Sequence, residues 1–266
     1  MLIFTMTADT LVNKEVKLFY NGSLADALEN CNKEGYQALS MPEIADARIQ
    51  ASKEDQLWRN WLSSTSIRAT GKTKQGNAVV VYAHVPNHFS EPKNIRTAIE
   101  QGLVNGAGKL PQEEFQRLLD LKDDKKVFVI DYNKLKSSTS DVIQVSKALK
   151  HSQTVPFLGG QERAEKYLER HSQVYGKNIG VWHSDDLRDE PLARLLFVGN
   201  YVNYGLDGIS DLVLNGSFAG VRAVGAQKSP VEIKAPTLED ILKVSRDFVP
   251  RTCRDAFKEE IRKLYQ

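Results

Sequence analysis

A run of β-branched residues that stops at a proline constrains the fold of this chain more than any other stretch. Val79-Val80-Val81 lies inside an apolar segment that ends just before Pro86. A continuous run of such residues, without polar alternation, is typical of a strand that is buried on both faces. Proline lacks the backbone N–H that a central strand must donate, so it ends the run. Residues 77–85 are therefore predicted to form a central strand of a sheet.

The elements around this strand mix helices with hairpins and single strands. Residues 64–72 are predicted to pair with the central strand as a β-hairpin, because the linker between them contains Gly76 and glycine suits a tight turn. Residues 161–175 repeat apolar side chains at helical spacing, which predicts an amphipathic helix. The order lacks the regular strand–helix alternation of a parallel α/β protein. We therefore expect an α+β fold, with a mixed β-sheet flanked by helices.

The length of the chain limits how many domains it can form. With 266 residues, 41% of them hydrophobic, it can bury a core without disulfides or a metal. We expect residues 1–266 to form a single compact domain, with a helical C-terminal tail over residues 237–266. The stretch Asn105-Gly106-Ala107-Gly108 is the loosest in the first half of the chain, so a division into subdomains would fall near 104–111.

Composition and charge limit the location and the partners of the protein. Its two cysteines cannot build a disulfide framework or a four-cysteine zinc site. No run approaches the roughly 20 apolar residues of a membrane span, and the apolar N-terminus lacks the basic region of a signal peptide. We therefore expect a soluble protein of the cytoplasm, without a membrane partner. The net charge of +2 gives no marked basic excess, so nucleic acid is not expected as a partner.

Two histidines follow the central strand, and their spacing raises the question of a zinc site. His84 and His88 are four residues apart, which on a helix would place both side chains on one face, as in zinc proteases. Pro86 lies between them, and no glutamate stands beside His84. The helical zinc-protease motif is therefore excluded.

A second polar cluster follows a short apolar strand that ends at residue 182. His183, Asp185 and Asp186 offer an imidazole and two carboxylates within four residues. His183 is predicted to act as a general base, because a neighbouring carboxylate can fix the tautomer of its ring. Arg188 and Arg194 are predicted to bind an anionic group of a substrate. The alternative for this cluster is a solvated polar turn that caps a short helix.

The two regions would form one site under a single condition. Ligands gather where parallel strands end. The residues His84, Asp131, His183 and Asp185 would therefore meet if the strands that end near residues 85, 130 and 182 were neighbours and ran in the same direction. Nitrogen and oxygen ligands of this kind suit zinc, manganese or iron. A divalent metal is therefore a cofactor that such a site could hold, and it could activate water for hydrolysis.

Two classes of function follow from these observations. The first is a small-molecule enzyme of hydrolytic type, with His84, His183, Asp185 and Asp186 as catalytic residues and a small-molecule ligand. The second is a non-catalytic binding or assembly protein without an active site, because no motif with a strong signal occurs in the chain. The sequence leaves the substrate, the reaction and self-association open.

Overall fold

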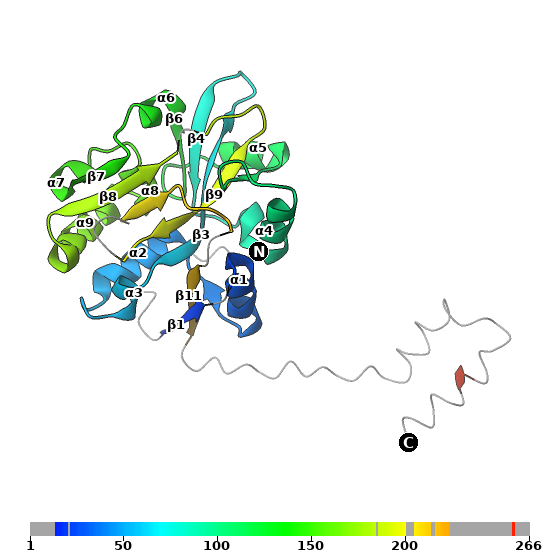
Figure 1. Ribbon diagram of the computed structural model, residues 1–266, viewed down its shortest axis with the longest axis horizontal. Helices are drawn as coiled ribbons and strands as arrows, with labels where there is room; N and C mark the ends of the chain where they lie inside the picture. Colours follow the sequence, from blue (N-terminus) through cyan, green and yellow to red (C-terminus); the bar gives the residue numbers. More distant parts are fainter. Residues whose placement is uncertain are drawn as a thin grey trace. The chain divides into compact units, whose positions relative to one another are not determined.

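The computed structural model describes residues 14–20, 22–184, 186–200, 205–213, 216–223 and 257–258. The described residues up to 223 belong to one compact unit, shown in Figure 1. The predicted helical tail lies outside the described residues, apart from residues 257–258, which are helical.

A single mixed sheet organises the described part of the chain and joins eleven strands. Along its main path the order is β1-β11-β3-β9-β10-β8-β7, and β4 pairs with both β3 and β6. β10 runs parallel to β8 and β11 runs parallel to β3, whereas the other paired strands are antiparallel. The strands are β1 (Lys14–Tyr20), β2 (Gln37–Ala38), β3 (Leu62–Lys72), β4 (Ala78–Ala83), β5 (Gly108–Lys109), β6 (Val127–Asp131), β7 (Asp141–Gln144), β8 (Asn178–His183), β9 (Leu192–Val198), β10 (Leu206–Gly208) and β11 (Ser217–Ala223).

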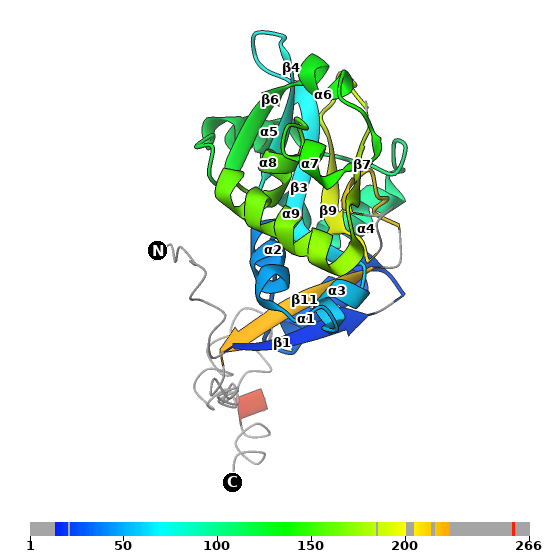
Figure 2. The same cartoon turned by 90° about the vertical axis from the view of Figure 1, so that its left-hand side faces the viewer.

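Helices cover the sheet, so the predicted α+β fold with a mixed sheet is confirmed. α2, α8 and α9 contact one another and lie together in front of the sheet in Figure 2. The helices are α1 (Leu24–Lys33), α2 (Met41–Gln50), α3 (Gln56–Arg59), the 3-10 helix η2 (His88–Ser90), α4 (Pro92–Glu100), α5 (Gln112–Asp120), α6 (Tyr132–Lys136), α7 (Val145–Ala148), α8 (Thr154–Leu158) and α9 (Gln161–Tyr175).

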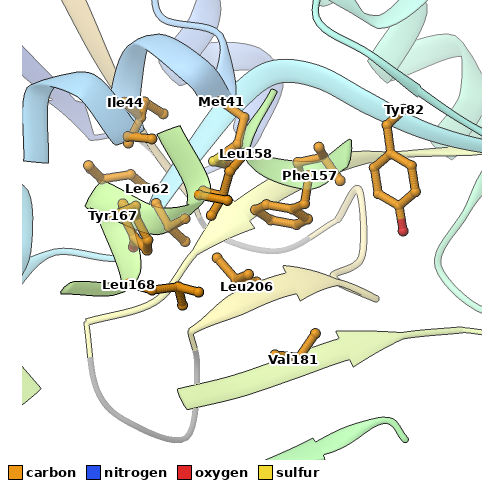
Figure 3. Packing of buried hydrophobic residues seen from close by; sticks show 14 of the residues in the cluster. Met41, Ile44, Leu62, Tyr82, Phe157, Leu158, Tyr167, Leu168, Val181 and Leu206 are labelled. Atoms are coloured by element: carbon orange, nitrogen blue, oxygen red, sulfur yellow. The ribbon is translucent and has the colours of Figure 1, made fainter. Parts of the chain in front are cut away.

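The valine run lies in β4, a central strand with a hydrophobic cluster on each face, as its continuous apolar composition predicted. Val80 and Tyr82 join a hydrophobic cluster with α2 and α9, part of which is drawn in Figure 3. Val79, Val81 and Ala83 point into the other cluster, which contains side chains of α1, α4 and α5. Because successive side chains of a strand face opposite sides, a strand that serves two cores must be apolar at every position.

The predicted hairpin and the predicted amphipathic helix are also present. β3 and β4 pair in antiparallel register, and Gly76 in their turn has φ of +83°, a conformation in which glycine carries no steric cost. α9 buries Ala164, Tyr167, Leu168 and His171, and ends at Gly176. Of the described helices, none combines the length and the apolar character that a membrane span requires.

Candidate functional site

The order and the directions of the strands decide whether the predicted site residues can meet. β4 runs antiparallel to both β3 and β6. β3 is antiparallel to β9, β9 is antiparallel to β10, and β10 is parallel to β8, so β8 and β6 run opposite to β4. His84 directly follows the end of β4, whereas Asp131 pairs with Val79 near the start of β4. Three strands, β3, β9 and β10, lie between β4 and β8, which ends at His183. The shared site required the three strands to be neighbours that run in the same direction. β4 runs opposite to β6 and β8, so this requirement is not met.

His84 takes part in a chain of hydrogen bonds inside the core. Its Nε2 lies 2.8 Å from the carbonyl oxygen of Pro156, which can only accept, so Nε2 carries the proton. Nδ1 then accepts from the hydroxyl of Ser66 at 2.9 Å, and Ser66 Oγ accepts from the backbone N–H of Met41. Burial lowers the pKa of His84 to about 4. Both ring nitrogens thus have protein partners, and the imidazole joins β3 and β4 to the start of α2 and to α8.

His183 is also buried, and it faces a segment that precedes β7. Its Nε2 lies 3.2 Å from the carbonyl oxygen of Ser138, and its backbone N–H donates to Ser140 Oγ. The ring of His151 lies 5.7 Å away, centroid to centroid. Asp185 lies outside the described residues.

Asp186 and Arg194 form a buried ion pair instead of serving His183. Arg194 Nη2 lies 2.5 Å from Asp186 Oδ2, and the two side chains are only 3% and 7% exposed. Asp186 Oδ1 accepts from the side-chain amide of Asn105 at 2.9 Å. Burial raises the pKa of Asp186, but the hydrogen bonds from Asn105 and Arg194 outweigh this effect, so its pKa lies below the ordinary value.

The guanidinium of Arg194 ties three loops together. Beyond its bond to Asp186, it donates to the carbonyl oxygens of Asn105 and Ile209. These acceptors belong to the loop between α4 and β5, the loop between β8 and β9, and the loop after β10. We call the surface of these loops, residues 101–107, 184–190 and 209–213 without Asp185, the loop face.

The first of these loops contains most of the stretch Asn105-Gly106-Ala107-Gly108, which the sequence indicated as loose. Val104 and Ala107 exchange two backbone hydrogen bonds of 2.9 Å. Asn105 and Gly106 between them have φ of 50° and 82°, which is the two-residue turn that Asn-Gly favours. Gly106 O also accepts from the N–H of Leu212. Residues 104–107 are therefore a tight turn that is fixed to its neighbours.

The loop after β10 is held by the buried carboxylate of Asp207. Asp207 Oδ1 accepts from the backbone N–H groups of Ile209 and Ser210 at 2.9 and 3.0 Å, and Oδ2 accepts from the Ser210 hydroxyl. Burial raises the pKa of Asp207, and these hydrogen bonds only partly offset that effect. Ile209 and Val213 are left 40% and 51% exposed. The loop therefore presents apolar side chains on a backbone that is firmly held.

A second buried arginine supports the start of the loop between β8 and β9. Arg68 on β3 lies opposite Arg194 on β9 in the antiparallel register. It donates through Nη1 to Ser184 Oγ at 2.8 Å and through Nη2 to the backbone carbonyl of Ser184. Burial lowers the pKa of Arg68. The two arginines thus hold the loop at both Ser184 and Asp186.

The structure separates the two arginines that the sequence grouped as substrate ligands. Arg194 is buried and its guanidinium is used within the protein, whereas Arg188 is exposed on the loop face. Sequence reasoning missed Arg68 and Asn105, whose partners are distant in the chain. It also missed Asp207, whose partners Ile209 and Ser210 lie only two and three residues away, so the local Asp turn was a signal that could have found it. Among the residues that the structure describes, no group of three or more His, Cys, Asp or Glu side chains is placed to hold a metal ion.

Comparison with known proteins identifies the scaffold. No family model and no curated protein matches the chain. A solved structure reported as "Accommodation of massive sequence variation in Nanoarchaeota by the C-type lectin fold" is similar over 79% of this chain and 98% of its own, with 60% sequence identity and a TM-score of 0.75.

This relative contradicts the prediction of a hydrolytic small-molecule enzyme and favours the alternative, a non-catalytic binding protein. The prediction failed because it gave catalytic roles to polar residues at strand ends. His84 and Asp186 instead make hydrogen bonds that hold the fold. At this identity and coverage, the chain belongs to the family of C-type lectin-fold proteins that the nanoarchaeal structure represents.

Proposed function

We propose that the chain is a non-catalytic binding protein that recognises its ligand with the loop face. The observation that carries this proposal is the buried pair of Asp186 and Arg194, from which hydrogen bonds reach three loops. Buried charges that are paired and hydrogen-bonded fix a local structure firmly. A recognition surface needs such a support, because loops that are already ordered lose less entropy when they bind.

In the loops of the loop face, one set of residues is buried and holds the backbone in place, and another set is exposed to solvent. Arg194, Asp186 and Asp207 are buried, whereas Arg188 and Val213 are exposed. Exposed side chains away from buried networks can usually be replaced at small cost in stability. The nanoarchaeal relative is described as accommodating massive sequence variation. We propose that this chain tolerates variation at the exposed positions of the loop face, because its buried anchors hold the loops.

A carbohydrate is the first ligand class to test, because the relative carries a lectin fold. The exposed side chains of Arg188 and Asp189 can hydrogen bond to sugar hydroxyls. Ile209 and Val213, exposed on the same loop face, can cover the apolar face of a sugar ring. This mixture of polar and apolar groups is what we expect of a site that binds without chemical conversion.

The test compares glycan-array profiles of three purified proteins. The wild type is expected to bind a subset of glycans, and Arg188→Ala/Ile209→Ser/Val213→Ser is expected to lose them. The matched control is Lys93→Ala/Val16→Ser/Leu121→Ser, whose residues are also exposed but lie outside the loop face. The control should bind as the wild type does. Binding that survives the loop-face substitutions, or that the control loses equally, would place recognition elsewhere.

A further inference from the structure

A second surface lies along β7, the strand at one end of the sheet. β7 pairs with β8, and no other described strand pairs with it. Its outer edge therefore presents backbone N–H and C=O groups that no strand in the described part of the chain uses. Open edges of this kind are templates for pairing with another extended chain.

Lysines surround this edge, and none of the ion pairs among the described residues includes them. We call these exposed side chains and the outer side of β7 the lysine edge: Lys134, Lys136, Lys147, Lys150 and Lys177. Residues 132–153 hold four lysines and one aspartate, a formal charge of 4 − 1 = +3. This short segment therefore carries a larger positive charge than the whole chain, whose net charge is +2.

Hydrogen bonds show that the lysine positions flank both ends of β7. At one end, the hydroxyl of Ser152 donates to the carbonyl oxygen of Lys134 at 3.3 Å, which brings the end of α6 beside the turn after α7. At the other end, the N–H of Val145 donates to the carbonyl oxygen of Lys177 at 2.8 Å. Residues that carry lysines therefore lie close to the segments at both ends of the strand.

One amide of β7 already has an anionic acceptor that an incoming strand could replace. The N–H of Val142 donates to Asp141 Oδ1 at 2.6 Å. This amide is therefore not used in the ladder with β8. A carbonyl oxygen of an added strand could take the place of the carboxylate without disturbing the pairing of β7 with β8.

We infer that the lysine edge binds an extended acidic peptide, which adds a strand to β7. Backbone pairing requires a partner with peptide N–H and C=O groups, and nucleic acids lack this pattern. The lysines repel basic peptides and form no ion pairs with neutral peptides. The edge therefore binds acidic peptides in preference to the other two classes. This inference is independent of the proposed ligand of the loop face.

The experiment measures binding of a dye-labelled decapeptide of alternating Glu and Val to the full chain by fluorescence anisotropy. Lys134→Glu/Lys147→Glu/Lys150→Glu is expected to weaken binding about tenfold or more at low salt. The matched control reverses three exposed lysines outside this edge, Lys53→Glu/Lys93→Glu/Lys122→Glu. The control should change the affinity less than about twofold. Equal losses in the two variants would show a general charge effect and overturn the inference.

Two further measurements separate strand addition from charge attraction alone. Hydrogen exchange at the Val142 amide of the wild type should slow when the peptide is added, because a strand partner replaces the exposed carboxylate. Val142→Pro removes an N–H that the ladder with β8 does not use, so it should keep the melting temperature and weaken binding about fivefold.

Three results would contradict the inference. Unchanged exchange at Val142 on peptide binding would mean that the lysines attract the peptide without strand pairing. Duplex DNA that binds as tightly, with the same loss in the lysine variant, would assign the surface to polyanions in general. No binding of the acidic peptide at about 1 mM, a concentration at which weak peptide recognition is detected, would mean that the lysines only protect an open edge.

Discussion

At the scale of single residues, the loop face depends on charges that are buried and paired. Arg194 supplies donors to three loops, and Asp186 supplies the negative charge that makes its burial tolerable. A buried charge without its partner is far more costly than the pair is favourable. The stability of the protein should therefore respond strongly to either member.

The ion pair gives a direct prediction for unfolding in urea. Asp186→Asn should lower the free energy of unfolding by about 3 kcal/mol or more, because it leaves Arg194 buried without a counter-charge. The control is Asp189→Asn, which removes a carboxylate that is 97% exposed and pairs with Lys72, and it should stay close to the wild type. Equal stability of the two variants would contradict a buried role for Asp186.

Two buried histidines predict how stability depends on pH. Burial lowers the pKa of both His84 and His171 to about 4. The unfolded chain, with ordinary imidazoles, then binds more protons than the folded chain between the lowered and the ordinary pKa values. The stabilisation is complete above pH of about 6.5 and is lost as the pH falls towards about 4, by about 3 kcal/mol for each histidine.

Urea unfolding at a series of pH values between these limits checks the prediction. His171→Gln cannot take up a proton and should flatten the pH dependence, even if it lowers stability at neutral pH. Its ring is held by a hydrogen bond between Nε2 and the carbonyl oxygen of Asn178. A pH dependence that is as steep in His171→Gln as in the wild type would show that other groups cause it.

At the scale of elements, local sequence patterns predicted the valine-rich strand, its hairpin and the long amphipathic helix, but not the directions of the strands. The valine run of β4, the β3–β4 hairpin and α9 follow from patterns within a few residues of one another. The antiparallel course of β4 and β6 depends on contacts across the sheet, and no local pattern encodes it. The strand order is not encoded locally either: β3, β9 and β10 lie between β4 and β8, so the strands that precede His84 and His183 are not the neighbours that a shared site required.

The Asn105–Gly106 turn shows how a local signal can mislead. The glycines near residue 106 suggested a loose segment, yet they allow a tight turn. A Cβ on Gly106 would lie 1.0 Å from Asp211 Oδ1. The packing of this turn against Asp211 comes from a part of the chain that is distant in sequence, so the sequence alone could not reveal it.

This turn gives a prediction with a closely matched control. Gly106→Ala should lower the free energy of unfolding by about 2–3 kcal/mol, because it adds a clash with Asp211 to the cost of positive φ. Gly76 has nearly the same φ, +83°, and no atom lies within 4 Å of a Cβ built there, so Gly76→Ala should cost only about 1 kcal/mol. Calorimetry of both variants checks the difference. Equal costs would mean that the turn is not packed against Asp211.

At the scale of the whole molecule, composition and element order were sufficient to predict an α+β fold with a mixed sheet, and insufficient to predict the function. The anchors of the loop face come from positions far apart in the chain. Asn105 and Asp186 are 81 residues apart, and Arg68 and Ser184 are 116 residues apart. A single sequence gives no sign of such pairs. The polar cluster predicted after residue 182 does lie in one of the three loops, but the prediction gave it a catalytic role.

The central claim is that buried anchors hold the loop face independently of its exposed side chains. The measurement that tests it most directly is the melting temperature of two variants. Replacing four exposed residues together, Arg188→Ala/Asp189→Ala/Ile209→Ser/Val213→Ser, should shift the melting temperature by no more than about 3 °C. Arg194→Met alone should lower it by about 10 °C, since it leaves Asp186 without its partner. A quadruple variant that melts as early as Arg194→Met would contradict the claim.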